Sequence, residues 1–96
     1  MFKPLNPLLH SELRLAVMSL LMTMGEADFV YIKKETKATS GNLSVQIEKL
    51  SEAGYIEVKK SFVDKRPRTT CLITKKGQEA FAEYVEALKT YFNSIS

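Results

Sequence analysis

The sequence predicts a mainly α-helical domain with one small β-hairpin, in the order helix, helix, helix, strand, strand, helix (α-α-α-β-β-α). Apolar residues recur at helical spacing over residues 11–24, 40–53 and 75–94. Two short segments, 55–62 and 69–73, instead alternate in polarity or are rich in β-branched residues. The 96 residues suit a single domain, 1–96, and the apolar content of 45% excludes a disordered or fibrous chain.

The first helix is expected to begin after Ser11 as N-cap and to end at Met24, with Gly25 just beyond it. Two apolar stripes follow different faces of this helix. The first stripe comprises Leu9, Leu13, Val17, Leu20 and Met24, and the second comprises Leu8, Leu15, Met18 and Met22. A helix that is apolar on nearly all sides must be covered on nearly all sides, which in so small a domain indicates a second subunit.

A helix, a short turn and another helix are expected over residues 28–54. Asp28 suits the N-cap of a short helix, 29–36, because its carboxylate can accept hydrogen bonds from free N–H groups of the first turn. The next helix, 40–53, ends before Gly54, which suits a left-handed cap. At about 100° per residue its core face consists of Leu43, Ile47 and Leu50.

The opposite face of helix 40–53 is small and polar at its N-terminal half. Gly41 lies in the first turn, where glycine costs roughly 0.5–1 kcal/mol relative to alanine. Ser40, Asn42 and Ser44 place hydroxyl and amide groups beside the free backbone N–H groups and the positive end of the helix dipole. We therefore expect Gly41 to let this helix end approach a phosphate or the floor of a groove. The alternative is that residues 39–41 form only a tight turn.

Residues 55–62 and 69–73 are expected to pair as antiparallel strands. Their connection, 63–68, carries Lys65, Arg66 and Arg68 around Pro67, which cannot donate to a ladder. A splayed basic loop at the tip of a hairpin is therefore predicted. The alternative is a solvated loop whose charges only keep the protein soluble.

The last helix is expected to begin after Thr74 and to run to about residue 94. A helix of about 20 residues is roughly 30 Å long, which is about the diameter of a compact domain of this size. Its far half, with Leu88, Tyr91, Phe92 and Ile95, would then have little of its own chain to pack on. This predicts a dimer built from the terminal helices.

Positive charge is concentrated in the middle of the chain. Residues 30–76 hold eleven Lys or Arg and five Asp or Glu, a net charge of +6, whereas the two ends together carry −3. A basic middle between acidic ends is typical of a chain that presents one surface to a polyanion. A polar helix end followed by a basic hairpin is the winged helix-turn-helix arrangement, with the helix in the major groove and the hairpin, or wing, on the flanking backbone.

The segment TSGNLSVQIEKLSEAGYIEVKKSFVDKRPRTTCLITKKGQEAF (39–81) resembles the small winged-helix transcriptional regulators related to the MarR and ArsR groups. The shared pattern is T-x-G-N-L-S at the helix start, A-G-Y before the first strand, R-P-R-T in the hairpin and K-G-x-x-A-F in the last helix. LLHSELRLAVMSLL (8–21) and ADFVYIKKET (27–36) resemble the first two helices of the family. Ile47 and Cys71 depart from the leucine or aromatic residue often found there, which affects packing and leaves the DNA face unchanged.

The resemblance implies a cytoplasmic, homodimeric protein that binds double-stranded DNA and is not a membrane protein. It places helix 40–53 in the major groove and the wing, 59–69, on the flanking backbone or minor groove. The residues expected at the DNA are Lys37, Thr39, Ser40, Gly41, Asn42, Ser44, Val45, Gln46, Lys49, Lys65, Arg66, Arg68 and Thr69. The first helix (about 8–24) and the last (about 75–94) are expected to form the dimer through Leu8, Leu15, Met18, Met22, Tyr84, Leu88, Tyr91, Phe92 and Ile95.

Two of these side chains suit base recognition in particular. Gln46 can pair bidentately with adenine, and Val45 can contact a thymine methyl group. The alternative is that both are ordinary surface residues. An unidentified small-molecule effector could bind between the first and last helices, although no residue pattern specifies one.

Catalytic and metal chemistry are not predicted. One histidine, one cysteine and no glycine-rich phosphate loop leave no nucleophile and base to assemble, so no enzyme activity and no cofactor are expected. His10 has no partner at metal-ligand spacing, and Cys71 in a strand is expected to be a buried apolar residue. The rival function is a winged helix that binds a protein or RNA without sequence-specific recognition of DNA.

Overall fold

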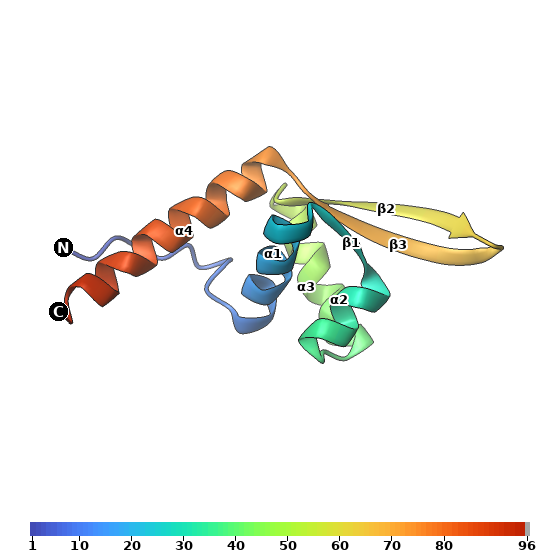
Figure 1. The fold of residues 1–96 in the computed structure, drawn as a ribbon, viewed down its shortest axis with the longest axis horizontal. Coiled ribbons are helices and arrows are strands. Elements are labelled where there is room, and N and C mark those ends of the chain that lie inside the picture. The colour runs from blue at the N-terminus through green and yellow to red at the C-terminus, as the bar shows by residue number, and fades with distance from the viewer. Residues whose placement is uncertain (96) are drawn as a thin grey trace.

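The computed structural model describes residues 1–95, which form four helices and three strands (Figure 1). The elements are α1 (Glu12–Met24), β1 (Glu26–Asp28), α2 (Phe29–Thr36), α3 (Ser40–Glu52), β2 (Ile56–Val63), β3 (Arg66–Ile73) and α4 (Lys75–Asn93). The predicted four helices and hairpin are confirmed, in a winged helix-turn-helix fold. Strand β1 is an addition that the sequence analysis did not predict.

Side-chain caps explain where three of the helices begin. The side chains of Asp28, Thr39 and Thr74 each accept a hydrogen bond from the backbone N–H three residues further on, at 2.8, 3.2 and 3.0 Å. Ser11 occupies the N-cap position of α1 as predicted, but its side chain makes no capping hydrogen bond. Gly25 and Gly54 follow α1 and α3 with φ of 80°, the left-handed region in which glycine carries no steric penalty.

The three strands form an antiparallel sheet in the order β1-β3-β2, with β3 in the centre. Cys71 of β3 lies opposite Ala27 of β1 on one side and Val58 of β2 on the other. These three side chains join the apolar interior under the sheet. Strand β1 thus ties the end of α1 to the hairpin.

The tip of the hairpin is tighter than the sequence predicted. Strands β2 and β3 stay paired as far as Val63 and Arg66, so the turn consists only of Asp64 and Lys65, with φ of 53° and 65°. Positive φ at both central residues is the conformation that matches the twist of a two-residue hairpin. The prediction of a splayed loop over residues 63–68 is therefore wrong, because Pro67 lies where β3 has no second neighbour and needs no donor on that side.

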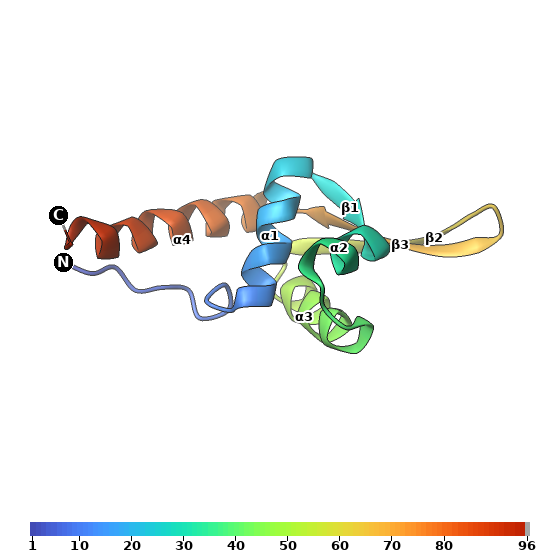
Figure 2. The same cartoon turned by 60° about the horizontal axis from the view of Figure 1, so that its bottom comes forward.

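Helix α1 lies at the centre of the helical layer, against α2, α3, β3 and α4 (Figures 1 and 2). Its residues Val17, Met18 and Leu21 are fully buried, as are Leu43 and Leu50 of α3. The predicted core face of α3 is confirmed. The rest of the chain covers the middle of both apolar stripes of α1, whereas Met22 and Met24 at their C-terminal ends stay exposed at 38% and 45%.

The molecule is elongated, measuring 54 × 25 × 21 Å. The β2–β3 hairpin projects at one end and α4 at the other, while the two chain termini lie together beside the free end of α4 (Figure 1). The N-terminal segment runs along α4: the backbone N–H of Lys3 donates to Thr90 Oγ1 at 3.2 Å, and the rings of Phe2 and Tyr91 lie 4.8 Å apart.

Candidate nucleic-acid interface

The N-terminal half of α3 presents a small polar surface to solvent. Ser40, Gly41, Asn42 and Ser44 are all exposed, and Val45 is 48% exposed beside them. Lys49 extends this exposed face by one turn. The predicted residues of α3 therefore lie together on one face, with a single apolar side chain among hydroxyl and amide groups.

Gly41 has no packing role within the chain. Its φ lies outside the positive region, and a Cβ built on it would meet no heavy atom within 4 Å. Neither backbone conformation nor a neighbouring side chain therefore requires glycine at this position. An approach by another molecule remains as a physical reason for it.

Gln46 differs from its neighbours because both ends of its amide are hydrogen-bonded. Its Oε1 accepts from the Arg14 guanidinium of α1, and its Nε2 donates to Asn42 Oδ1 at 2.9 Å. The side chain is half-buried. A free amide for bidentate pairing with adenine is thus absent. Arg14 was not among the predicted site residues. It is the only charged residue between Glu12 and Gly25, and this isolated charge in an apolar helix could have indicated a specific polar partner.

The wing, residues 59–69 as predicted, consists of the outer halves of β2 and β3 and carries the second group of predicted residues. Lys65, Arg66 and Arg68 are exposed, and Thr69 is half-buried near the base. The hairpin extends away from the helices (Figure 2), and Lys65 and Arg66 lie at its tip. Such a projection can follow a nucleic-acid backbone that passes the end of α3.

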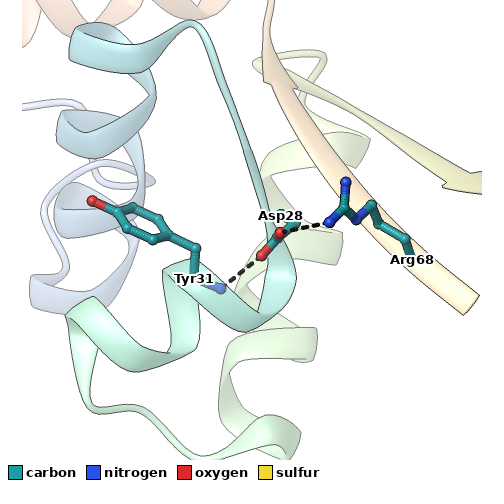
Figure 3. Close-up of polar contacts among 3 residues, drawn as sticks. All are labelled: Asp28, Tyr31 and Arg68. Atoms are coloured by element: carbon teal, nitrogen blue, oxygen red, sulfur yellow. Dashed lines mark hydrogen bonds and ion pairs between the residues drawn. The ribbon is translucent and has the colours of Figure 1, made fainter. Parts of the chain in front are cut away.

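Arg68 is held against the helical body by Asp28. Its Nη2 lies 3.8 Å from Asp28 Oδ2, while the other carboxylate oxygen accepts from the backbone N–H of Tyr31 (Figure 3). One carboxylate therefore caps α2 and orients the wing. The side chains of Asp28 and Arg68 are 32% and 51% exposed, respectively, so their ion pair contributes little stability by itself.

Most cations of the basic middle have no anionic partner in the described part of the chain, although Lys76 Nζ lies 5.8 Å from the centre of the Tyr55 ring. Among residues 1–95, Arg68 is the only one of the eleven Lys and Arg of segment 30–76 with an ion pair. Lys37 is exposed at the C-terminal end of α2 with φ of 59°, just before α3. Thr39 lies beside it, but its hydroxyl accepts the capping hydrogen bond of α3 and contributes mainly to helix geometry.

Two open hollows flank the wing. One, of about 950 Å³, lies between α2 and the wing and is bordered by Tyr31, Lys34, Arg66 and Arg68 among others. The second, of about 520 Å³, lies between α3 and the wing, where Ser44, Lys60 and Thr69 meet the acidic Glu48 and Glu52. The wing and α3 thus form two walls of one concave surface.

The residues predicted for a dimer interface fall into two groups. Met18 is 0% and Tyr84 is 4% exposed, so both belong to the core of the single chain and are wrong as surface contacts. Tyr84 also shares a 2.9 Å hydrogen bond with His10 Nδ1. The others remain at least partly accessible: Leu8, Leu15, Met22, Leu88, Tyr91, Phe92 and Ile95. Phe92 and Ile95, at 59% and 82% exposed, mark the free end of α4.

Burial raises the pKa of the Cys71 thiol to about 11, because the thiolate would lose hydration in the apolar interior. The predicted buried apolar role is confirmed. Within residues 1–95 no three His, Cys, Asp or Glu side chains come together as a metal site. No helix in the described part of the chain is long and apolar enough to cross a membrane.

Known proteins share both the sequence and the shape of this chain. The uncharacterized protein MJ0432 of Methanocaldococcus jannaschii is 37% identical over 76 residues, which cover 79% of this chain and 83% of that protein. A transcriptional regulator homologue from Pyrococcus horikoshii OT3 superimposes with a TM-score of 0.88 at 31% identity, over 95% of this chain and 90% of the other.

A more distant neighbour shares the fold alone. BpsR of Bordetella bronchiseptica, whose DNA binding is regulated by 6-hydroxynicotinic acid, has a TM-score of 0.70 at 21% identity, over 85% of this chain and 61% of its own. Residues 13–92 match the family described as winged helix DNA-binding domain. The chain therefore belongs to the winged helix DNA-binding domain family.

Proposed function

We propose that this protein is a homodimeric transcriptional regulator that binds duplex DNA at specific sequences. The observation that carries the proposal is an exposed, small and polar helix end beside a projecting basic wing, with Ser44 of α3 and Lys60 and Thr69 of the wing lining one hollow. Membership of a DNA-binding family supports it. Such a regulator would act in the cytoplasm, where bacterial and archaeal DNA lies.

In this proposal α3 enters the major groove with its N-terminal half leading. Gly41 lets the backbone come close, while the first N–H groups and the dipole of α3 favour a phosphate at the groove edge. Ser44 and Val45 then face base edges, where Val45 suits the methyl group of thymine. Lys37 and Lys49 flank this contact and neutralise phosphates on either side.

The wing would follow the backbone beside that groove. Arg66 and Arg68 suit this role because a guanidinium pairs with two phosphate oxygens and fits a narrow minor groove. Thr69 and Lys65 add a hydroxyl and an ammonium at the two ends of the wing. Asp28 keeps Arg68 close to its working position before DNA arrives.

Dimerisation through the terminal elements would duplicate this surface. The free end of α4 projects beyond the helical body and has the N-terminal segment beside it, leaving Phe92 and Ile95 uncovered (Figure 1). A two-fold dimer would place two copies of α3 about one DNA turn apart on a pseudo-palindromic site. A small-molecule effector, of the kind that regulates BpsR, is a further prediction for this chain.

The experiment is a salt titration of DNA affinity for the wild type and for Arg66→Ala/Arg68→Ala. Each phosphate contact contributes about 0.9 to the slope of log K against log[salt], so the double variant should lower the slope by about 1.8 as well as the affinity. Equal slopes and affinities would exclude the wing as a DNA contact. Binding of single-stranded RNA in preference to duplex DNA would favour the rival function.

A further inference from the structure

A chain of hydrogen bonds connects the N-terminal segment through α1 to the exposed end of α3. The Arg14 guanidinium donates from Nε to the Leu8 carbonyl oxygen at 2.5 Å and from Nη1 to Gln46 Oε1. Gln46 Nε2 then donates to Asn42 Oδ1 at 2.9 Å. Arg14 and Gln46 are half-buried, whereas Asn42 is exposed. We call these three side chains the Arg14 relay.

The chemistry of arginine fixes the direction of every bond in the relay. A guanidinium can only donate hydrogen bonds, so the atom of Gln46 that faces it must be the oxygen. The NH₂ group of Gln46 must then face Asn42, which in turn must present its own oxygen. A rotation of either amide by 180° would place two donors or two acceptors against each other. Both amides are therefore held in one orientation.

This orientation determines what Asn42 offers to another molecule. One lone pair of its Oδ1 accepts from Gln46, and its backbone N–H donates to the Thr39 side chain at 3.2 Å. The remaining polar group is the side-chain NH₂, which carries two donors. Asn42 lies next to Gly41, where α3 has no side-chain bulk to keep a partner away.

The donors and acceptors on base edges distinguish a free asparagine from one that mainly donates. A free asparagine pairs bidentately with adenine, because it accepts from N6 and donates to N7. An asparagine whose oxygen already accepts from Gln46 keeps one lone pair, but its oxygen is turned toward Gln46, so it forms that pair less well. Guanine presents two acceptors, O6 and N7, in the major groove and suits a group that only donates.

We propose that Arg14 is a positioning residue for base selection: by fixing Gln46 it biases Asn42 toward donation, so that α3 prefers guanine over adenine at one base pair. This inference rests on the proposed function and concerns the same surface. It also replaces the expectation that Gln46 itself reads adenine, because the Gln46 amide serves as the link.

The test compares duplexes selected from a randomised pool by the wild type, Arg14→Met, Gln46→Met and Asn42→Ala. The wild type should prefer guanine over adenine at one position by about tenfold, the magnitude of a good base contact. Arg14→Met and Gln46→Met should reduce that preference to about twofold or less at that position, since both free the Asn42 amide. Asn42→Ala should abolish it, and adding Arg14→Met to Asn42→Ala should change nothing further.

Controls separate positioning from charge and from folding. Lys49→Met removes the same charge from α3 itself without touching the relay, so it should weaken all duplexes equally and leave the base preference intact. Circular dichroism establishes whether each variant folds. If Arg14→Met does not fold, the base preference of Gln46→Met tests the inference. In ¹⁵N–¹H spectra of the free protein, the side-chain NH₂ signals of Gln46 and Asn42 should both shift in Arg14→Met.

An unchanged guanine preference in folded Arg14→Met and Gln46→Met would overturn the inference, and so would an equal loss of affinity for all sequences. Either result would leave the proposed function standing. A wild type that selects no sequence at all would instead overturn the proposed function, and the inference with it.

Discussion

Replacing Gly41 by alanine should make the protein more stable and at the same time a weaker DNA binder. The added methyl group meets no atom within 4 Å in the free chain, and the backbone at this position is not left-handed. Alanine therefore gains its full advantage in a helix and loses nothing to packing. In a bound duplex, however, the same methyl group would point at the surface that approaches α3.

The magnitudes follow from these two environments. Replacing glycine by alanine in a helix stabilises by about 0.5–1 kcal/mol, which corresponds to a rise in Tm of roughly 2–8 °C for a domain of this size. Forcing a methyl group into a close-packed contact costs about 1–3 kcal/mol, which would weaken DNA binding by roughly 5- to 150-fold. The two effects have opposite signs and are measured on the same sample.

The assays are thermal melting by circular dichroism and fluorescence anisotropy with the preferred duplex. Gly77→Ala is the matched comparison, because Gly77 also lies in the first turn of its helix but its Cβ would stand 2.1 Å from the Tyr55 carbonyl oxygen. That variant should be clearly destabilised. Gln78→Ala, exposed on α4, should be slightly stabilised with unchanged affinity. A stabilised Gly41→Ala variant with wild-type affinity would refute the reasoning.

Three further predictions concern other parts of the molecule. Asp28→Ala removes the cap of α2 and the partner of Arg68, so urea denaturation should show a loss of about 1 kcal/mol, and an unchanged midpoint would contradict the capping role. The pKa of the Cys71 thiol is raised to about 11, so the thiol stays protonated at pH 8. Ellman's reagent should therefore label Cys71 at pH 8 only after unfolding, and rapid labelling of the folded protein would contradict its burial. Leu88→Glu/Phe92→Glu should give a monomer by sedimentation and bind a two-half-site duplex at least tenfold more weakly, whereas a persistent dimer would place the interface elsewhere.

Helix limits could be predicted closely because their causes are local. Asp28 and Thr74 precede apolar periodic runs, and their side chains cap the first turn of the helix that follows. Gly25 and Gly54 come after such runs and have positive φ. Each of these residues acts within one helical turn. One sequence is therefore enough to predict where α1, α2, α3 and α4 begin or end.

The features that escaped prediction depend on partners distant in the chain or on an unusual local conformation. Strand β1 has only three residues, too few for alternation, and exists because it pairs with β3 more than 40 residues later. The turn at Asp64 and Lys65 lacks the glycine that usually marks such a hairpin. The hydrogen bond between Arg14 of α1 and Gln46 of α3 joins residues that are 32 positions apart, so it could be found only in the folded chain.

Exposure of the residues predicted on α3 followed from helical geometry, whereas exposure of the residues predicted for a dimer did not always follow. Ser40, Asn42 and Ser44 share the exposed face that helical geometry assigned to them. Burial of Met18 and Tyr84, in contrast, follows from how α1 and α4 pack within one chain. Periodicity identifies an apolar face but does not identify which molecule covers it.

The most direct measurement is the ratio of affinities for a duplex selected from genomic fragments and for a random duplex of equal length, both at physiological salt. The account predicts a ratio of at least about 10³, the lower end for specific DNA-binding proteins. A ratio near one would contradict sequence-specific binding, and absence of binding to either duplex even at low salt would contradict a role on DNA.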